Sequence, residues 1–202
     1  MIWLRRVMRK LTNDVDLEEL HAEIWGRLRR AASDRRSHLR WVNLATIGLD
    51  GLPHVRTVIL RGVLPRQRIL QFHTDRRSAK FAELSADYRL SLHFHDRKVV
   101  EQIRSLGFGA VAPDEEARQV WTNLHQGIRE TYLQAEAPSL FLVIPRLSDQ
   151  TAKLAPNEGF ANFAVINVSA VEIDWLLLGG GVHKRVKFKL AGPQVDASWV
   201  HP

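Results

Sequence analysis

Short turns between strand-like segments are the feature that most limits what this chain can fold into. Asp50-Gly51 is a strong hairpin signal between two such segments, and Gly179-Gly180-Gly181 separates another pair. Strands are expected at 41–48, 54–62, 68–74, 88–95, 98–111, 163–178 and 182–190, with a last edge strand around Trp199. Antiparallel hairpins therefore dominate, and no strand–helix–strand alternation is visible.

Helices are expected from Asp14 or Asp16 to about Ala32, from 78 to 86, and from 113 to about 124 with further turns up to Gln134. Together, the segments predict an α+β fold. Its centre is an antiparallel β-barrel of six or seven strands, closed or nearly closed, with helices at its flanks.

Length and composition favour one domain. It is expected to span residues 1–202, with residues 1–12 as a basic N-terminal extension. There is no cysteine, which excludes disulfides, cysteine-based zinc sites and thiol nucleophiles. The longest uncharged run of note, 159–171, is shorter than the roughly 20 residues that cross a bilayer. No secretory signal is recognisable, so a cytoplasmic location is expected.

A net charge of +7 suits nucleic acid, an anionic membrane or a phosphorylated small molecule. Six arginines crowd the stretch from Arg27 to Arg40, and the favoured interpretation is the solvated face of a helix and the loop after it. No RNA-binding motif with interleaved aromatic residues and no zinc-finger spacing occurs, which argues against nucleic acid.

Basic residues occur in a strand–turn–helix order that suits a phosphate group. Arg56 and Arg61 bound one strand segment, and 73–75 leads through a turn to Ser78-Ala79-Lys80 at a helix start. Unpaired N–H groups and the helix dipole favour an anion there. A solvated basic surface is the alternative interpretation. Strand alternation puts Arg56 and Arg61 on opposite faces, so they share one ligand only by touching different parts of it, or if the strand bulges or ends between them.

The order of the segments from about Trp41 onwards resembles that of the pyridoxamine (pyridoxine) 5′-phosphate oxidase superfamily, the FMN-binding split β-barrels. Residues 56–61 match its Arg-x-Val-Leu-Leu-Lys strand with Arg in place of the final Lys, and 73–74 and 78–80 partly match its Tyr-Thr and Ser-Arg-Lys. Gln102 stands where that family has a Gln leading to a Gly. Trp175, the glycine turn and 182–185 match its Trp, glycine-rich turn and Leu-His-x-Arg.

The resemblance implies an FMN cofactor bound between the subunits of a homodimer. Arg56, Ser78 and Lys80 would hold the phosphate, and Trp175 and Arg185 would reach the flavin from the partner subunit. The full set of implied cofactor-binding residues is Arg56, Thr57, Val58, Ile59, Arg61, His73, Thr74, Ser78, Lys80, Gln102, Trp175 and Arg185.

The resemblance also implies an oxidase. The amine or alcohol carbon of a small, phosphorylated, vitamin B6-like substrate would give a hydride to flavin N5, and O₂ would reoxidise the flavin to yield H₂O₂. His183 and Arg185 would be catalytic. The implied substrate-binding residues are Arg61, Trp121, His125, Arg129 and His183.

Two departures weaken the substrate part of this resemblance. Trp121, His125 and Arg129 stand where the family has Tyr, Arg and Ser, and we expect them to share one helix face. Gly181 stands where the family has the Arg of its Arg-Leu-His triplet. A related FMN-binding reductase or oxidase with another substrate, and a non-enzymatic flavin- or haem-binding barrel, therefore stay open as alternatives.

Several of these residues also have ordinary structural interpretations. Trp175 would be a core aromatic residue, Gln102 the partner of a neighbouring strand, and Trp121 a packing contact between helix and barrel. His183 would be a structural histidine. His93 and His95 share a strand face, but lining residues are favoured over a metal site there, and we expect no metal.

Overall fold

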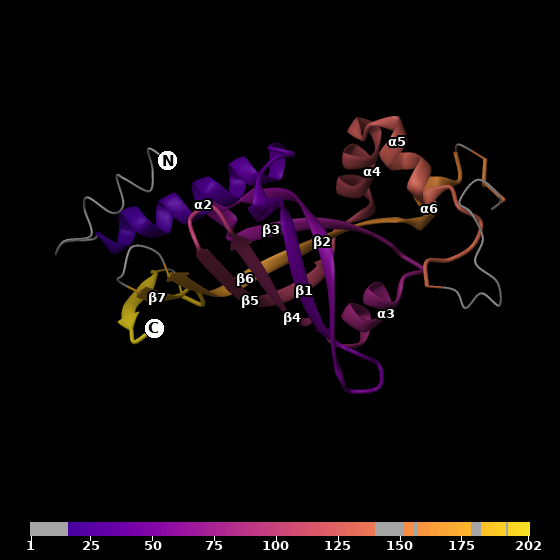
Figure 1. Cartoon of the computed structure of the whole chain (residues 1–202). Coiled ribbons are helices and arrows are strands. Elements are labelled where there is room, and N and C mark those ends of the chain that lie inside the picture. Colours follow the sequence, from indigo (N-terminus) through magenta and orange to yellow (C-terminus); the bar gives the residue numbers. More distant parts are fainter. Residues whose placement is uncertain (1–15, 140–151, 156, 179–182, 193) are drawn as a thin grey trace.

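The computed structural model describes residues 16–139, 152–155, 157–178, 183–192 and 194–202, and its centre is an antiparallel β-barrel (Figure 1). The barrel strands are β1 (Trp41–Ile47), β2 (Pro53–Leu64), β3 (Ile69–Asp75), β4 (Arg89–Asp96), β5 (Glu101–Val111) and β6 (Phe163–Leu177). They follow the order β3-β2-β1-β4-β5-β6, and pairing of β3 with β6 closes the barrel. Two further strands, β7 (Lys184–Lys189) and β8 (Asp196–Val200), extend the sheet beyond β6.

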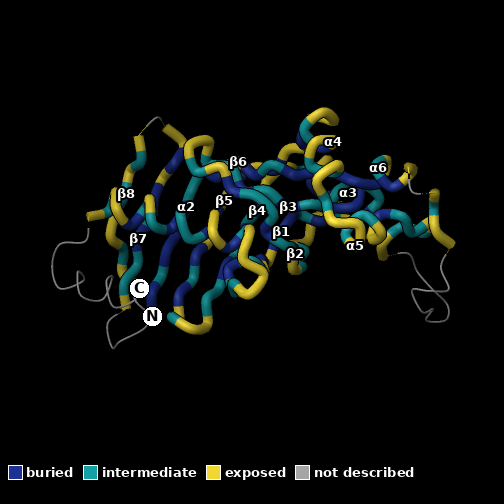
Figure 2. The backbone as a smooth tube through the Cα atoms, turned by 90° about the horizontal axis from the view of Figure 1, so that it is seen from above, coloured by how far each residue is buried: buried dark blue, intermediate teal, exposed yellow. Residues whose placement is uncertain are grey.

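Alternation of apolar and polar side chains is what makes these segments strands. In β4, for example, Leu90, Leu92 and Phe94 are buried, while Ser91 and His93 lie on the other face. Figure 2 shows the buried residues running along the strands. The largest fully buried side chains of this core are Trp175, Phe94, Phe188, Leu44 and Ile103.

Helix α2 (Leu17–Ser33) packs against this barrel core. Its N-cap is Asp16, whose side chain accepts a hydrogen bond of 2.9 Å from the N–H of Glu18. The buried face of α2 contains Leu20, Ile24, Trp25, Leu28 and Ala31. The spacing of three and four between these residues is the reason that one face of α2 is apolar.

The remaining helices are short. Helix α3 (Ala79–Ala86) follows β3, and 3₁₀ turns η1 (His38–Arg40) and η2 (Pro65–Gln67) flank β1 and β2. At the opposite end of the barrel from β7 lie α4 (Asp114–Asn123), α5 (Gln126–Arg129), the 3₁₀ turn η3 (Glu130–Tyr132) and α6 (Gly159–Asn162) (Figure 1). They build a second, smaller core on β6, with Ala112, Ala117, Tyr132, Phe163 and Val165 buried in it.

The predicted α+β barrel is confirmed, with differences in detail. The helix expected from 113 to 124 ends at Asn123, and the chain restarts as α5 after a break at Leu124 and His125. Strand β5 begins at Glu101 instead of 98, since Val100 takes a positive φ of 52° in the turn before it. The predicted extension 1–12 and the Gly179–Gly181 turn lie outside the described residues, as does most of the loop before α6.

Candidate functional site

The barrel is split between β2 and β3. Their pairing runs from Leu64 opposite Ile69 to Leu60 opposite Phe72, and then stops. Beyond Phe72, β3 pairs with β6 alone among the described residues. The edge of β2 from Arg56 to Ile59 therefore has no strand partner on this side, and its backbone N–H and C=O groups are available to a ligand.

Residues 57–59 can contribute only part of their side chains to that edge. Val58 is buried in the core, and the Thr57 hydroxyl donates a hydrogen bond of 3.1 Å to Asn43 Oδ1 on β1. Contacts from Thr57 and Val58 to a ligand would therefore come mainly from the backbone.

The turn from β3 into α3 is tightly organised. The Ser78 hydroxyl donates a hydrogen bond of 2.7 Å to the Asp75 carbonyl oxygen and lies 3.0 Å from the Thr74 hydroxyl. Asp75 accepts a bond of 2.8 Å from the Arg77 N–H and pairs with its guanidinium. The N–H groups of 79 and 80 have no hydrogen-bond partner in the described part of the chain. This turn places two hydroxyls and free N–H groups beside the open edge of β2.

Lys80 brings a second positive charge to the same place. Its half-buried ammonium has no hydrogen bond or ion pair within the described residues. Burial lowers the pKa of Lys80, and the nearby charge of Arg56 lowers it further, so the two cations lie close together. A pair of neighbouring cations is stabilised by a bound anion.

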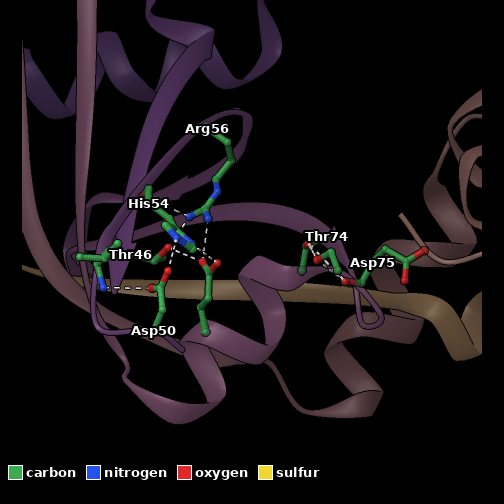
Figure 3. A network of polar contacts seen from close by, with 9 residues as sticks. Thr46, Asp50, His54, Arg56, Thr74 and Asp75 are labelled. Atoms are coloured by element: carbon green, nitrogen blue, oxygen red, sulfur yellow. Dashed lines mark hydrogen bonds and ion pairs between the residues drawn. The ribbon is translucent and has the colours of Figure 1, made fainter. Parts of the chain in front are cut away.

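Arg56 is held by a buried carboxylate. Its Nη2 lies 2.7 Å from Glu83 Oε2 on α3, and its Nη1 donates to the Thr46 hydroxyl on β1. Figure 3 shows Thr46, His54 and Arg56 gathered at this point. A guanidinium has five N–H groups, so Arg56 keeps further donors, including Nε–H, for a ligand.

Arg61 lies at the bulge of β2, because the register with β3 shifts between Leu60 and Gly62. A bulge at this position is one of the two conditions under which Arg56 and Arg61 could contact one ligand. Five residues of strand separate them by about 17 Å, a span that suits the two ends of an extended mononucleotide. Burial, together with the positive charge of Arg40, lowers the pKa of Arg61, and its guanidinium has no hydrogen-bond partner among the described residues.

His73 and Tyr132 lie near Arg61. Burial lowers the pKa of His73 to about 3, and its Nδ1 is buried with no partner among the described residues. Its ring meets Phe163 edge-on at 5.0 Å between centroids. Burial raises the pKa of Tyr132 to about 12, and its ring packs on the same Phe163 at 5.1 Å. These neutral groups and one cation form the far end of the candidate site.

Gln102 and Arg185 lie elsewhere. Gln102 on β5 and Arg185 on β7 both point to the outer face of the sheet. They flank Leu176 of β6, which is opposite Gln102 on one side and opposite Arg185 on the other. The Gln102 side-chain oxygen is 3.3 Å from His93 Nε2, and Arg185 pairs with Asp174 at 2.7 Å. Within one chain these side chains do not join Arg56 and Lys80. His183 is exposed just before β7.

Trp175 departs from the expectation that it reaches the flavin. It has no exposed surface, and its indole N–H donates to Glu101 inside the barrel. Side chains along β6 point alternately inward and outward, and Leu176, the residue after Trp175, is the one opposite Arg185 on the outer face. Trp175 therefore points inward, away from Arg185. The core interpretation of Trp175 therefore describes its position.

Trp121, His125 and Arg129 do not share one helix face as expected. Trp121, in the last turn of α4, packs among Tyr132, Phe160 and Phe163, with ring centroids 5.2 to 6.0 Å away. His125 is the N-cap of α5 and accepts from the Gly127 N–H. Arg129 donates to backbone carbonyls at 2.9 and 3.0 Å. The helix break separates these residues and gives each a structural contact. Gly181, the other departure, lies outside the described residues.

Sequence reasoning missed four residues of the site: Thr46, His54, Glu83 and Tyr132. Two local signals were available. His54 is two residues before Arg56, so both point to the same strand face, and Glu83 follows Lys80 by one helical turn. The contact of Glu83 with β1 and β2 is long-range and has no local signature.

Metal and membrane features can be checked only in the described residues. No three or more His, Asp or Glu side chains gather there in a way that could hold a metal ion, and the His93 and His95 rings simply stack 6.3 Å apart. None of the helices described is long and apolar enough to span a membrane.

The barrel and the candidate site together define a class of ligand-binding protein. A split antiparallel barrel with an open strand edge, free N–H groups and two neighbouring cations at one end is built to bind an extended anionic ligand such as a flavin mononucleotide. Lys80, Arg56, Thr74 and Ser78 fit its phosphate end, and Arg61 fits the opposite end.

The comparisons with known proteins agree. Residues 22–113 match the family model for the FMN-binding domain of pyridoxamine 5′-phosphate oxidase. The chain is 29% identical over 174 residues to pyridoxine/pyridoxamine 5′-phosphate oxidase 2 of Arabidopsis thaliana, covering 78% of this chain and 85% of that protein. It is 27% identical over 165 residues to the Agrobacterium fabrum pyridoxine/pyridoxamine 5′-phosphate oxidase, covering 78% of each.

Solved structures show the same fold. A pyridoxamine 5′-phosphate oxidase-related, FMN-binding protein of Nostoc punctiforme aligns with a TM-score of 0.73 at 22% identity, covering 93% of this chain and 100% of that one. PhzG of Burkholderia lata aligns with a TM-score of 0.70 at 15% identity, covering 96% of each chain. Residues 22–113 are therefore similar in sequence to the FMN-binding domain of pyridoxamine 5′-phosphate oxidase, the fold is that of the FMN-binding split barrels, and these likenesses support FMN as the cofactor.

Proposed function

We propose that the chain is an FMN-dependent oxidase acting on an amine or alcohol of a small anionic substrate of the vitamin B6 phosphate type. One observation carries the proposal: Lys80 and Arg56, two neighbouring cations, lie beside the open edge of β2 at one end, and Arg61, whose guanidinium has no hydrogen bond within the described residues, lies at the other. Arg56, Lys80, Ser78 and Thr74 would hold the FMN phosphate and ribityl end, with the backbone of 57–59 along the chain.

A second copy of the chain is part of this proposal. Gln102 and Arg185 share the outer sheet face and cannot meet Arg56 within one subunit. If they contact flavin, they do so for the site of a partner, which supports a homodimer with FMN at the interface. Exposed apolar side chains on the outer face, including Trp41, Val55 and Leu106, are consistent with such a contact.

The residues of this chain would then have distinct roles. FMN, when bound, supplies the hydride acceptor, and O₂ is the proposed final acceptor. Arg61 would hold the anionic group of the substrate, beside the neutral imidazole of His73. Arg61 and Arg185 are positive charges that would favour an anionic reduced ring. His183 is exposed just before β7 and would take up the substrate proton at a ring nitrogen.

One observation favours a second candidate, a related oxidase or reductase with a different substrate. His125 and Arg129 have structural contacts, so the helix after β5 lacks free side chains for a substrate phosphate. Arg61 alone would hold a carboxylate as readily as a phosphate. PhzG, of the same fold, was crystallised with tetrahydrophenazine-1-carboxylic acid.

A cytoplasmic location stays a prediction.

The test is anaerobic reduction of the bound flavin. Pyridoxamine phosphate and pyridoxine phosphate should bleach the flavin absorbance, and admission of O₂ should restore it with release of H₂O₂. Unphosphorylated pyridoxine should react more slowly, and Arg61→Gln should remove that difference. If neither phosphorylated vitamer bleaches the flavin while an aromatic carboxylate or a reduced nicotinamide does, the second candidate replaces the first.

A further inference from the structure

Glu83 gathers three side chains at the proposed phosphate end. Its carboxylate, with a side chain only 3% exposed, accepts hydrogen bonds from Thr46 at 2.5 Å, His54 Nδ1 at 2.8 Å and Arg56 Nη2 at 2.7 Å. His54 and Arg56 are two residues apart on β2, so their side chains leave the strand on the same face. Figure 3 shows His54 and Arg56 converging.

We propose that His54 is an additional cationic contact for the FMN phosphate, and that Glu83 is the positioning residue that holds His54 and Arg56 toward it. This inference rests on the proposed function and names a pH-dependent part of the same site.

The hydrogen bonds of Glu83 decide which atom of His54 titrates. Burial raises the pKa of Glu83, but hydrogen bonds from Thr46 and His54 outweigh it, so the carboxylate is charged near neutrality. A charged carboxylate only accepts, so the Nδ1 of His54 must carry a proton. Protonation therefore occurs at Nε2. In neutral His54 this atom offers a lone pair, and in the charged form it offers an N–H donor.

The charged groups around His54 have no net formal charge while His54 is neutral. Arg56 on β2 and Lys80 on α3 are positive, while Glu83 on α3 and Asp50 in the hairpin turn are negative, so their formal charges cancel. A phosphate monoester carries a charge between −1.5 and −2 at neutral pH. Protonated His54 makes the cluster positive. Its side chain is 42% exposed, so solvent and a ligand can reach it. Its Nε2 lies 3.4 Å from Asp50 Oδ2, and a bound phosphate would be a second acceptor for this atom.

Binding of the phosphate and protonation of His54 are then linked. The hydrogen bond to Glu83 raises the pKa of His54, and Asp50 adds to this. The protonated form binds FMN more tightly, so FMN affinity falls as pH rises through this raised pKa. We expect about a tenfold loss of FMN affinity between pH 6.5 and 9.

The experiment is a fluorescence titration of the flavin-free full-length chain with FMN and with riboflavin, from pH 6.5 to 9. The wild type should show the tenfold slope for FMN and none for riboflavin, which has no phosphate. His54→Gln should be flat and should equal the wild type within about twofold at pH 9, where His54 is neutral. His201→Gln, at an exposed histidine near the C-terminus, should keep the wild-type slope.

Two further variants separate positioning from folding. Glu83→Gln should bind FMN more weakly at every pH and lose the slope, while His54→Lys should bind tightly without a slope. If Glu83→Gln does not fold, the histidine variants still decide. A wild-type slope in His54→Gln overturns the inference and leaves the proposed function intact. A wild type that binds no FMN at any pH overturns both.

Discussion

His73 makes the stability of the fold sensitive to acid. Its pKa is about 3 in the folded chain, because burial and the charge of Arg61 disfavour the protonated ring, against 6.5 when exposed. Between these values the unfolded chain binds one proton more than the folded chain. Stability from this residue is therefore fully present above pH 6.5 and is lost as pH falls toward 3.

The size of the loss follows from the two pKa values. The unfolded imidazole gains most of its proton between pH 7 and pH 5, while the folded one gains almost none. The free energy of unfolding should fall by about 2 kcal/mol over this interval through His73 alone.

The measurement is urea unfolding of the flavin-free chain at pH 7 and pH 5, for the wild type and His73→Phe at one protein concentration. Phe keeps an aromatic ring against Phe163 and has no proton to gain. The wild type should lose about 2 kcal/mol more than the variant, since all other titrating groups cancel in the comparison. His201→Gln should behave as the wild type. Equal losses in the wild type and His73→Phe would refute the reasoning.

Three further predictions test other contacts. Lys80→Ala and Arg56→Ala should each weaken FMN binding by about 1.5–3 kcal/mol in a fluorescence titration. The control Lys98→Ala, in an exposed turn, should leave FMN affinity unchanged. Unchanged affinity in both site variants would locate the phosphate elsewhere. Glu101→Leu should cost about 3 kcal/mol in urea unfolding, because it removes the buried carboxylate that pairs with Arg27 and accepts the Trp175 indole N–H, and a change below about 1 kcal/mol would contradict that. Trp121→Ala should lower stability by about 3 kcal/mol and leave FMN affinity within about twofold, whereas the opposite pattern would make Trp121 a ligand wall.

Much of the barrel could be predicted because its signals are local. Asp50-Gly51 marks the β1–β2 hairpin, and Asp16 caps α2, each through its own backbone neighbourhood. Arg56 and Lys80 could be assigned to one site because strand, turn and helix follow each other in the chain. The helix after β5 and the further turns beyond it were predicted, but the shared face of Trp121, His125 and Arg129 was not found, since the break at Leu124 and His125 depends on a cap and not on propensity.

Contacts between distant segments could not be predicted. Trp175 is ten residues from Arg185, and that spacing suggested a common ligand, but a strand reverses faces at every residue and Trp175 falls on the inner one. Glu83 joins α3 to β1 and β2 over 27 to 37 positions of sequence, and a glutamate on a short helix is ordinarily solvated. Its buried position is a property of the closed barrel.

Discrimination between FMN and riboflavin is the measurement closest to the central claim, that the β2 edge and the α3 turn grip a phosphate. The flavin-free chain is titrated with each compound at pH 7. Affinity for FMN should exceed that for riboflavin by at least about a hundredfold, because Lys80 and Arg56 each contribute a charge-assisted contact. Equal affinities, or no uptake of FMN, would contradict the account.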